Sequence, residues 1–369
     1  MDQVLASARP QFTGKAAVGM AASAFGVAAA GARDLGSERD QTFGLHDPDG
    51  RLLAVLKVSN AAEDSAVLDM EAAAALHIGA ADPGLTVALP WRTSQTGDPG
   101  PARIGDDPAA LRARWPAGDG MHWLRLYDAL PGSSRIEATA LSDAALGAFG
   151  ATAARLARAL RGFGHPSAHR TMLWDVQHAL ATRSMLSDIR DPVARDAVAR
   201  VLDEFERSAL PAWPGLRAQV VHGDLTVDNT LTDSRGLVCG LIDFGDMSHT
   251  ALITDLASVL DSLGTGRDGP ELFRMGRLVL DGYQRHTELE EAELAVLGIA
   301  WAARSAVTIA ISSWRAAQGL EDPAFAERYN AQCLAMIDTM ERAGWPEVAR
   351  QLGARSVGDV GGVRGMGGG

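Results

Sequence analysis

Two short segments in the second half of the chain contain residue types that suit phosphate and metal chemistry. In "VVHGDLTVDN" (Val220–Asn229), Asp224 precedes Asn229 by five residues, and in "GLIDFGD" (Gly240–Asp246), Asp243 comes 19 residues after Asp224. Mg²⁺ prefers hard oxygen ligands and takes only one or two of them from a protein, leaving the rest to phosphates and water. We expect Asn229 and Asp243 to bind Mg²⁺ and Asp224 to orient a substrate hydroxyl, as phosphoryl transfer requires.

The chain between these residues is expected to bring them together. The stretch Asn229–Asp243 predicts a β-hairpin with its turn at Asp233–Gly236, and the apolar residues Leu237–Ile242 predict a buried strand that ends at Asp243. Because a hairpin of this length brings its two ends together, the polar side chains gather around one point.

Phosphoryl transfer also needs a cation on the phosphates of the nucleotide. Lys57 ends the apolar strand "LLAVLK", and Glu71 on the following helix is the expected partner of its ammonium group. The turn region "GSERDQTF" (Gly36–Phe43) offers Ser37 and backbone N–H groups that could surround phosphate.

The N-terminal part of the chain is rich in strand-forming residues. Asp40–His46 and Arg51–Val58 predict a hairpin with its turn at Asp47–Gly50, and helical spacing of apolar residues predicts a helix over Ala62–Ala80. Two further strands are expected, separated by a loop rich in Pro, Gly and Asp, at Leu85–Trp91 and Met121–Leu130.

The character of the sequence changes near Pro131–Arg135. Leu141–Leu210 and Leu252–Leu352 are expected to be helical, with the short β-rich segments that contain Val220–Asn229 and Gly240–Asp246 between them. We therefore predict an α+β fold of two lobes, a small β-rich N-lobe with one helix and a larger, mostly helical C-lobe. The predicted divisions are a nucleotide-binding lobe that ends in a hinge, a helical lobe with the catalytic and metal-binding loops, and a disordered Gly-rich tail, at residues 1–132, 133–355 and 356–369.

Composition narrows the functional class. The 369 residues carry a formal net charge of −12, which argues against a nucleic-acid-binding surface, since such a surface needs clustered Lys and Arg. The two cysteines, Cys239 and Cys333, form neither a disulfide framework nor a metal-ligand motif, so a cytoplasmic protein is expected.

The apolar segment Lys15–Arg33 raises the alternative of a signal peptide. Its apolar part is dominated by Ala and Gly and is shorter than the ~20 residues that span a bilayer. A packed N-terminal helix is the favoured interpretation, and no other stretch is expected to enter a membrane.

The set "HGDLTVDN … IDFGD", with a lysine on the N-terminal hairpin and a glutamate on the next helix, resembles the aminoglycoside phosphotransferase and choline kinase family. That family shares the bilobal fold of protein kinases. The resemblance implies that Asp224 is the catalytic aspartate and that Asn229 and Asp243 are the metal ligands. It also implies that Lys57 binds the α- and β-phosphates and that Glu71 holds Lys57.

The resemblance further implies the contacts to ATP or GTP. "LYDAL" (Leu126–Leu130) is similar to the hinge, with Tyr127 and Ala129 at the nucleotide base. The family's glycine-rich phosphate loop is absent, and "GSERDQ", with Ser37 and Arg39, takes its place.

Five longer motifs resemble the hydroxylysine kinase-like branch, namely "GSERDQTF", "LKVSNAAED", "GFGHPSAHRTMLWDV", "IDFGDMSHT" and "ISSWR". This resemblance implies an amino alcohol or a hydroxylated amino acid as phosphate acceptor. Three alternatives stay open: an aminoglycoside-type antibiotic phosphotransferase, a kinase like those for homoserine, choline or ethanolamine, and a non-catalytic nucleotide-binding pseudokinase. The partners expected are a nucleotide and a small-molecule hydroxyl acceptor, with no nucleic acid and no membrane.

The remaining candidates have a structural and a functional interpretation side by side. His222 is a candidate base, but a hydrogen bond that braces the catalytic loop is the favoured interpretation. Candidate substrate contacts, one of them an arginine that could bind a substrate carboxylate, are Asp246, Asp228, Arg304, Trp314 and Arg315.

Overall fold

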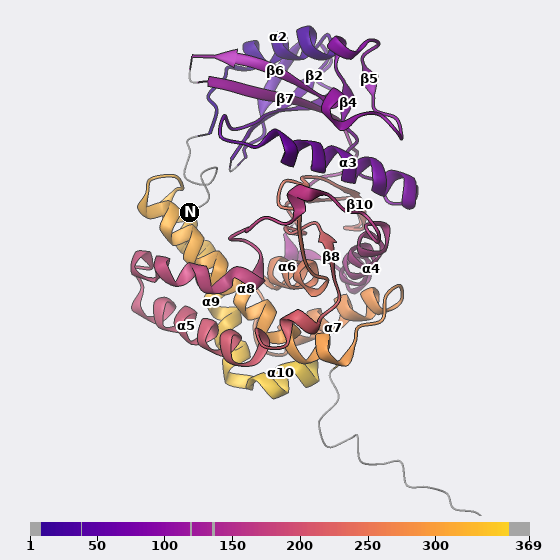
Figure 1. The fold of residues 1–369 in the computed structure, drawn as a ribbon. Helices are drawn as coiled ribbons and strands as arrows, with labels where there is room; N and C mark the ends of the chain where they lie inside the picture. The colour runs from indigo at the N-terminus through magenta and orange to yellow at the C-terminus, as the bar shows by residue number, and fades with distance from the viewer. Residues whose placement is uncertain (1–8, 38, 119, 135–136, 354–369) are drawn as a thin grey trace, which may run out of the picture. The chain divides into compact units, whose positions relative to one another are not determined.

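The computed structural model describes residues 9–37, 39–118, 120–134 and 137–353 (Figure 1). Contacts divide the chain into two compact units, and the first comprises Met1–Ile136, Arg155–Leu173 and Ala218–Thr250. The second comprises Glu137–Ala154, Trp174–Arg217 and Ala251–Gly369. This division is discontinuous in sequence, whereas the predicted lobes are continuous, so the lobe boundary at residue 132 stays a prediction. The predicted Gly-rich tail, 356–369, lies outside the described residues.

A five-stranded antiparallel sheet organises the first unit (Figure 1). Its order is β1-β2-β3-β7-β6, with bounds Gly31–Asp34, Gln41–His46, Leu52–Val58, Gly120–Asp128 and Arg112–Ala117. The predicted first hairpin is therefore confirmed as β2 and β3, and the strand predicted around residue 125 as β7. Strands β1 and β6 were not predicted. The segment predicted as a strand at Leu85–Trp91 forms only isolated bridges and the first residue of the two-residue strand β4 (Trp91–Arg92), which pairs with β5 (Gly100–Pro101).

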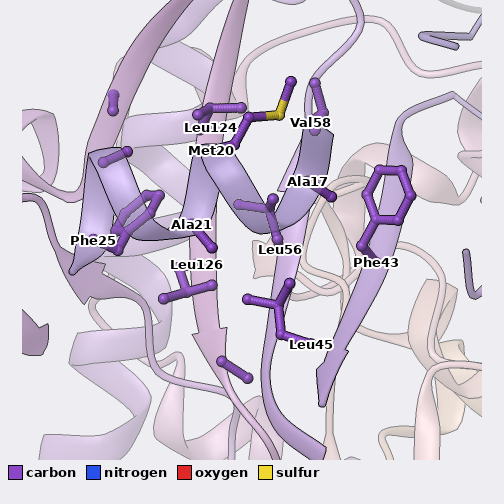
Figure 2. Close-up of a cluster of buried hydrophobic side chains, with 13 residues drawn as sticks. Ala17, Met20, Ala21, Phe25, Phe43, Leu45, Leu56, Val58, Leu124 and Leu126 are labelled. Atoms are coloured by element: carbon purple, nitrogen blue, oxygen red, sulfur yellow. The ribbon is translucent and has the colours of Figure 1, made fainter. Parts of the chain in front are cut away.

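Alternation along the strands separates an apolar face from a charged face of this sheet. Leu56 on β3 and Leu124 and Leu126 on β7 are fully buried and pack against helix α2 (Gly14–Phe25), as Figure 2 shows. Successive strand side chains point to opposite faces. Lys57, which follows Leu56, therefore points away from α2, and the same holds for the odd-numbered residues of β7.

Two helices accompany the sheet. Helix α2 begins after the N-cap Thr13, whose Oγ1 accepts from the amide of Ala16 at 3.2 Å, and ends at Gly26 with φ 66°. It confirms the packed helix expected near the N-terminus, although the helix ends at Phe25 and the last residues of the apolar segment belong to β1. Helix α3 (Ser65–Ala81) confirms the helix predicted over Ala62–Ala80, with Asp64 as its N-cap.

The β-rich segments after residue 217 belong to the first unit as well. β9 (Thr230–Thr232) and β10 (Val238–Leu241) pair as the predicted hairpin, and the amide of Asp233 donates to the carbonyl of Leu237 across its turn. β8 (Ala218–Val221) pairs with β11 (Ser248–Ala251), a strand that the sequence did not predict.

The second unit is almost entirely helical, as predicted. Helix α8 (Glu291–Ala317) is packed by several other helices, namely α5 (Pro192–Glu204), α6 (Ile253–Gly264), α9 (Pro323–Ala343), α10 (Trp345–Gln351) and the 3₁₀ helix η5 (Val176–Asp188). The other α-helices are α4 (Asp143–Ala159), which crosses the border between the units, and α7 (Gly269–Gln284). Short 3₁₀ and π segments lie at Ser94–Thr96, Pro108–Leu111, Ala138–Ala140, Pro166–Ala168, Phe205–Ala209 and Trp213–Gly215.

Glycines allow α4 and α7 to approach closely. A Cβ atom on Gly150 would lie 1.8 Å from the carbonyl oxygen of Val279, and one on Gly282 would lie 2.0 Å from that of Gly147. Neither separation can accommodate a side chain, so the two helices pack backbone to backbone at this crossing.

Helix α8 corrects the expectation that only the N-terminal segment has the composition of a membrane span. Its mean hydropathy of 1.8 over an 18-residue window and its length of 27 residues meet that test, and it is the one such helix among the described residues. However, 94% of that window is buried inside the structure, and Trp301 is fully buried. Its apolar character is that of a core helix.

Candidate active site

All the predicted residues of the catalytic and metal chemistry fall within the first unit. Strand β8 leads directly into the loop that begins with His222, which is fully buried. The Nε2 atom of His222 lies 3.1 Å from the carbonyl oxygen of Ile242, and Nδ1 lies 3.4 Å from the amide nitrogen of Asp224. A carbonyl oxygen can only accept, so Nε2 carries the proton and Nδ1 accepts. This geometry supports the bracing interpretation of His222.

Gly223 is required by the contact between two loops. Its φ of 83° lies in the left-handed region, and a Cβ atom there would lie 2.1 Å from the carbonyl oxygen of Asp246. The loop that carries Asp224 therefore lies directly against the loop that carries Asp246, and any side chain at position 223 would separate them.

Asp224 and Asn229 interact directly. The Nδ2 atom of Asn229 donates to Oδ2 of Asp224 at 2.7 Å and to its main-chain oxygen at 2.9 Å. Because the amide nitrogen is used in this way, Oδ1 of Asn229 is the atom that can serve as a ligand. The main-chain oxygen of Asn229 accepts from the amide of Ile242 at 3.1 Å, which places Asn229 beside the residue that precedes Asp243.

Asp243 adopts a strained backbone conformation. Its φ of 64° is the one positive value at a non-glycine position in the part of the chain that the structure describes. Burial opposes ionisation of its carboxyl group, but the ammonium of Lys57 and the guanidinium groups of Arg39 and Arg125 outweigh this and lower its pKa. Asp243 is thus held as a carboxylate, the form that binds a hard cation.

The donor set fits Mg²⁺ bound together with phosphates. An amide oxygen and one ionised carboxylate are the one or two protein ligands that Mg²⁺ usually takes. Among the described residues no group of three or more His, Cys, Asp or Glu is arranged to hold a metal ion by itself. A cation at Asn229 and Asp243 would therefore depend on a nucleotide for the rest of its ligands.

The predicted ion pair between Lys57 and Glu71 is wrong. Lys57 instead donates from Nζ to Oδ1 of Asp243 at 2.7 Å, and its side chain is only 13% exposed. Glu71 pairs with Arg125, which lies opposite Lys57 on the neighbouring strand β7. Burial opposes the charge on Lys57, but Asp243 and the nearby carboxylates raise its pKa.

Arg125 is a buried residue of this region that the sequence did not single out. Its guanidinium group donates to Glu71, to Oδ2 of Asp40 at 2.6 Å and to the hydroxyl oxygen of Tyr127 at 3.2 Å. The signal was present in "LRLY": an arginine between two core leucines must point to the opposite face of the strand, the face of Lys57.

The segment before β2 contacts the loop that follows Asp243. Arg39 pairs with Oδ1 of Asp246 at 2.7 Å, and both side chains are largely buried. Ser37 is half-buried in the same segment. From the other side, Arg170 donates to the main-chain oxygens of Gly245 and Met247. Asp246 therefore has a structural partner, and Arg170 is a loop-bracing residue that the sequence did not reveal.

Part of the backbone of the predicted hinge already forms hydrogen bonds within the protein. The amide of Asp128 donates to the carbonyl of Leu89 at 3.0 Å, and Tyr127 pairs with Val55 in the sheet. The side chain of Asp128 accepts from the indole of Trp91 at 2.8 Å. Ala129, next along the chain, is half-buried, and its contact with a nucleotide base stays a prediction.

The remaining substrate candidates are scattered. Asp228 is exposed on the loop between Asp224 and Asn229. Arg304, Trp314 and Arg315 belong to α8 in the second unit and are all buried. Arg304 lies over the ring of Trp174, with Cζ 4.8 Å from the ring centre, and Arg315 pairs with Glu321 at 3.5 Å. Both contacts lie within the helical unit, and the binding of a substrate by either arginine stays a prediction.

Comparison with known proteins supplies the family context. Residues 32–292 match the model of the phosphotransferase enzyme family, APH. Hydroxylysine kinase of Mus musculus is 26% identical over 334 residues, which cover 85% of this chain and 85% of that protein. Homoserine kinase of Rhizobium johnstonii is 34% identical over 110 residues, covering 30% of this chain and 33% of that protein.

Solved structures share the fold. Amicoumacin kinase hAmiN, in complex with AMP-PNP, Ca²⁺ and Ami, gives a TM-score of 0.65 at 18% identity and covers 90% of this chain and 95% of its own. A microcompartment-associated aminopropanol kinase gives 0.60 at 17% identity and covers 87% and 94%. These likenesses confirm the predicted α+β, protein-kinase-like fold class.

Proposed function

We propose that this protein phosphorylates an amino alcohol or a hydroxylated amino acid, with ATP or GTP as the phosphoryl donor. The chain belongs to the phosphotransferase enzyme family and is a small-molecule kinase with an alcohol group as acceptor. The hydrogen bonds from Asn229 to Asp224 carry this proposal, because they join the residue that would orient the acceptor to one that would hold the metal. The extent of the match to hydroxylysine kinase, 85% of each chain, supports the acceptor class.

The roles of the residues follow from their partners. The carboxylate of Asp224, held by the amide of Asn229, would accept a hydrogen bond from the acceptor hydroxyl and take its proton as the phosphoryl group transfers. Lys57, which now donates to Asp243, would donate to the nucleotide phosphates instead. His222 would keep the two loops together through the carbonyl of Ile242.

Asn229, through Oδ1, and Asp243 would hold Mg²⁺. When bound, the ion neutralises charge on the β- and γ-phosphates. Arg39 and Ser37 would lie at the phosphates of the nucleotide, and Tyr127 and Ala129 would lie near its base. The pairing of Arg39 with Asp246 supports the placement at the phosphates, because it puts the segment before β2 beside the proposed metal-binding loop.

A screen of acceptors tests the proposal. Nucleotide consumption would be coupled to a spectroscopic readout with ATP and with GTP, across hydroxylysine, homoserine, other hydroxy amino acids, amino alcohols, sugars and aminoglycosides. We expect acceptor-dependent turnover with hydroxy amino acids or amino alcohols. Turnover confined to aminoglycosides would favour the antibiotic phosphotransferase alternative, for which the net charge of −12 would suit a polycation. Nucleotide binding without turnover on any acceptor would contradict catalysis.

We also propose a cytoplasmic location without nucleic-acid or membrane partners. Cys239 and Cys333 are both free thiols in the structure, and the most apolar helix, α8, is buried. Fractionation of the native host would test the location, and recovery with the membrane fraction would contradict it.

A further inference from the structure

Two cations face each other on neighbouring strands beneath the candidate active site. Lys57 on β3 and Arg125 on β7 are partners in the antiparallel register, and the side chain of Arg125 is 4% exposed. Like charges directly opposite each other on a sheet are destabilising. The pair can persist only because each cation has carboxylate partners of its own.

Those partners are divided between the two cations. Lys57 takes Asp243, whereas Arg125 takes Glu71 of α3 and Asp40 of the segment before β2. The guanidinium group presents five N–H donors in a rigid plane, which suits two carboxylates held at fixed positions, whereas an ammonium group is a point charge with three rotatable donors. Glu71 is therefore already engaged by a residue other than the lysine beside it.

The contact with Asp40 extends this arrangement to the segment before β2 that holds Ser37 and Arg39, called the phosphate-binding segment after its proposed role. Oδ2 of Asp40 accepts from Arg125, and Oδ1 accepts from the amide of Asn60 at 3.1 Å, so the residue is fixed from two sides. Its neighbour Arg39 pairs with Asp246 at 2.7 Å. A continuous chain of contacts thus runs from Arg125 through Asp40 and Arg39 to the loop that carries Asp243.

We propose that Arg125 is a positioning residue for phosphoryl transfer, which anchors Glu71 and Asp40 so that Lys57 can exchange Asp243 for the nucleotide phosphates. This inference rests on the proposed function. In this arrangement Arg125 contacts neither nucleotide nor acceptor. It fixes the position of α3 and of the segment that holds Ser37 and Arg39. Because Arg125 binds Glu71 and Asp40, the ammonium of Lys57 has only its ion pair with Asp243 to give up when the nucleotide phosphates bind.

The alternative is that Arg125 only ties the sheet to helix α3. The chain contains a matched control for that role, because Arg112 on β6 forms a two-pronged pair with Asp69 of the same helix, at 2.6 and 3.0 Å. Arg112 is also the register partner of Arg125, but its ion pair is with Asp69 and not with Glu71 or Asp40. Arg112→Lys therefore weakens a sheet-to-helix contact without touching the proposed machinery.

The test compares Arg125→Lys with Arg112→Lys in the full chain. Titration calorimetry would measure the affinity for AMP-PNP with Mg²⁺, and thermal unfolding would report the fold. We expect at least a 10-fold loss of affinity in Arg125→Lys and less than a 2-fold change in Arg112→Lys, at similar unfolding temperatures. With the best acceptor, the KM for nucleotide should rise more than kcat falls.

A second substitution, Asp40→Asn, tests the same role from the other side of the contact. If Arg125→Lys does not fold, Asp40→Asn, which removes only the hold on the phosphate-binding segment, should reproduce the loss of affinity. Wild-type affinity in Arg125→Lys or Asp40→Asn would overturn the inference, as would equal losses in the Arg125 and Arg112 variants. A wild-type protein that fails to bind AMP-PNP would instead contradict the proposed function, and the inference with it.

Discussion

Asn229 donates from one amide nitrogen to both the carboxylate and the main-chain oxygen of Asp224, at 2.7 and 2.9 Å. The residue proposed to bind the metal therefore also orients the residue proposed to bind the acceptor hydroxyl. Disturbing either side chain should affect the other, so the most informative substitutions at this site keep size and polarity.

Asp224→Asn should remove proton acceptance while it keeps the shape of the side chain. We expect kcat to fall by about 10²–10⁴-fold, the usual contribution of a positioned general base, with nucleotide affinity within about threefold of wild type. Steady-state kinetics and calorimetry would separate the two effects. Asp49→Asn, in the exposed turn between β2 and β3, is the control, and turnover retained in Asp224→Asn would exclude the proposed mechanism.

Asp243→Asn and Asp243→Ala should differ in stability but not in metal dependence. Asn tolerates the left-handed conformation that Asp243 adopts at φ 64°, whereas Ala pays a cost of about 1–2 kcal/mol there. We expect both variants to lose the gain in AMP-PNP affinity that Mg²⁺ gives the wild type. Both should unfold at lower urea concentration because each removes the counterion of Lys57, and the Ala variant should unfold at the lower concentration of the two. A preserved Mg²⁺ effect in either variant, relative to EDTA, would remove Asp243 from the metal site.

Gly223→Ala should destabilise the protein by about 3 kcal/mol or more and abolish turnover, because the added Cβ meets the carbonyl oxygen of Asp246 at 2.1 Å in addition to the strain of φ 83°. Gly50→Ala is the matched control, since its φ is 81° but a Cβ atom there would meet no atom within 4 Å. Its cost should be about 1–2 kcal/mol. Urea unfolding measures both, and equal costs would show that the loop contact at Gly223 is dispensable.

Glu63 should make stability depend on pH near neutrality. Burial, reinforced by the charges of Glu71 and Asp40, raises the pKa of Glu63 from an ordinary 4.5 to about 7. Between these two values the folded protein binds more protons than the unfolded chain, so the free energy of unfolding falls as pH rises. The loss levels off about one pH unit above the raised pKa and amounts to at most about 3.4 kcal/mol.

Glu63→Gln should remove that loss, because an amide does not ionise. Urea unfolding from pH 5 to pH 8 should show the variant gaining stability over wild type as pH rises, with the gain levelling off at about pH 8. Glu327→Gln on the exposed surface of α9 should show no such gain. A constant difference between Glu63→Gln and wild type across this range would disprove the elevated pKa.

The hairpins and the three polar residues of the site could be predicted because their signals are local. A turn sequence and an alternating strand each act within a few residues, and the hairpin that they predict brings Asn229 beside the residue that precedes Asp243. The favoured interpretation of His222, a hydrogen bond that braces the catalytic loop, agrees with its contacts to Ile242 and Asp224.

The ion pairs could not be predicted because they depend on strand order. Glu71 is an acidic residue on the helix after Lys57 that points toward the sheet, and proximity in sequence made it the expected partner. The actual partner, Asp243, is 186 positions away, and Glu71 is taken by a residue of a strand whose place beside β3 no local signal reveals. Helix α8 was not predicted as an apolar span for a different reason, because polar residues such as Arg304 and Ser305 interrupt its hydrophobic sequence.

The opposed cations on β3 and β7 also limit how this protein can be divided. Residues 9–134 contain the whole five-stranded sheet, yet one of the carboxylates that make the pairing of Lys57 and Arg125 tolerable arrives only with Asp243. An excised N-terminal fragment would keep both positive charges and lose that counterion. Such a fragment is a poor choice as an autonomous nucleotide-binding module, and chimaeras with related kinases should exchange the segment around Asp243 together with the sheet.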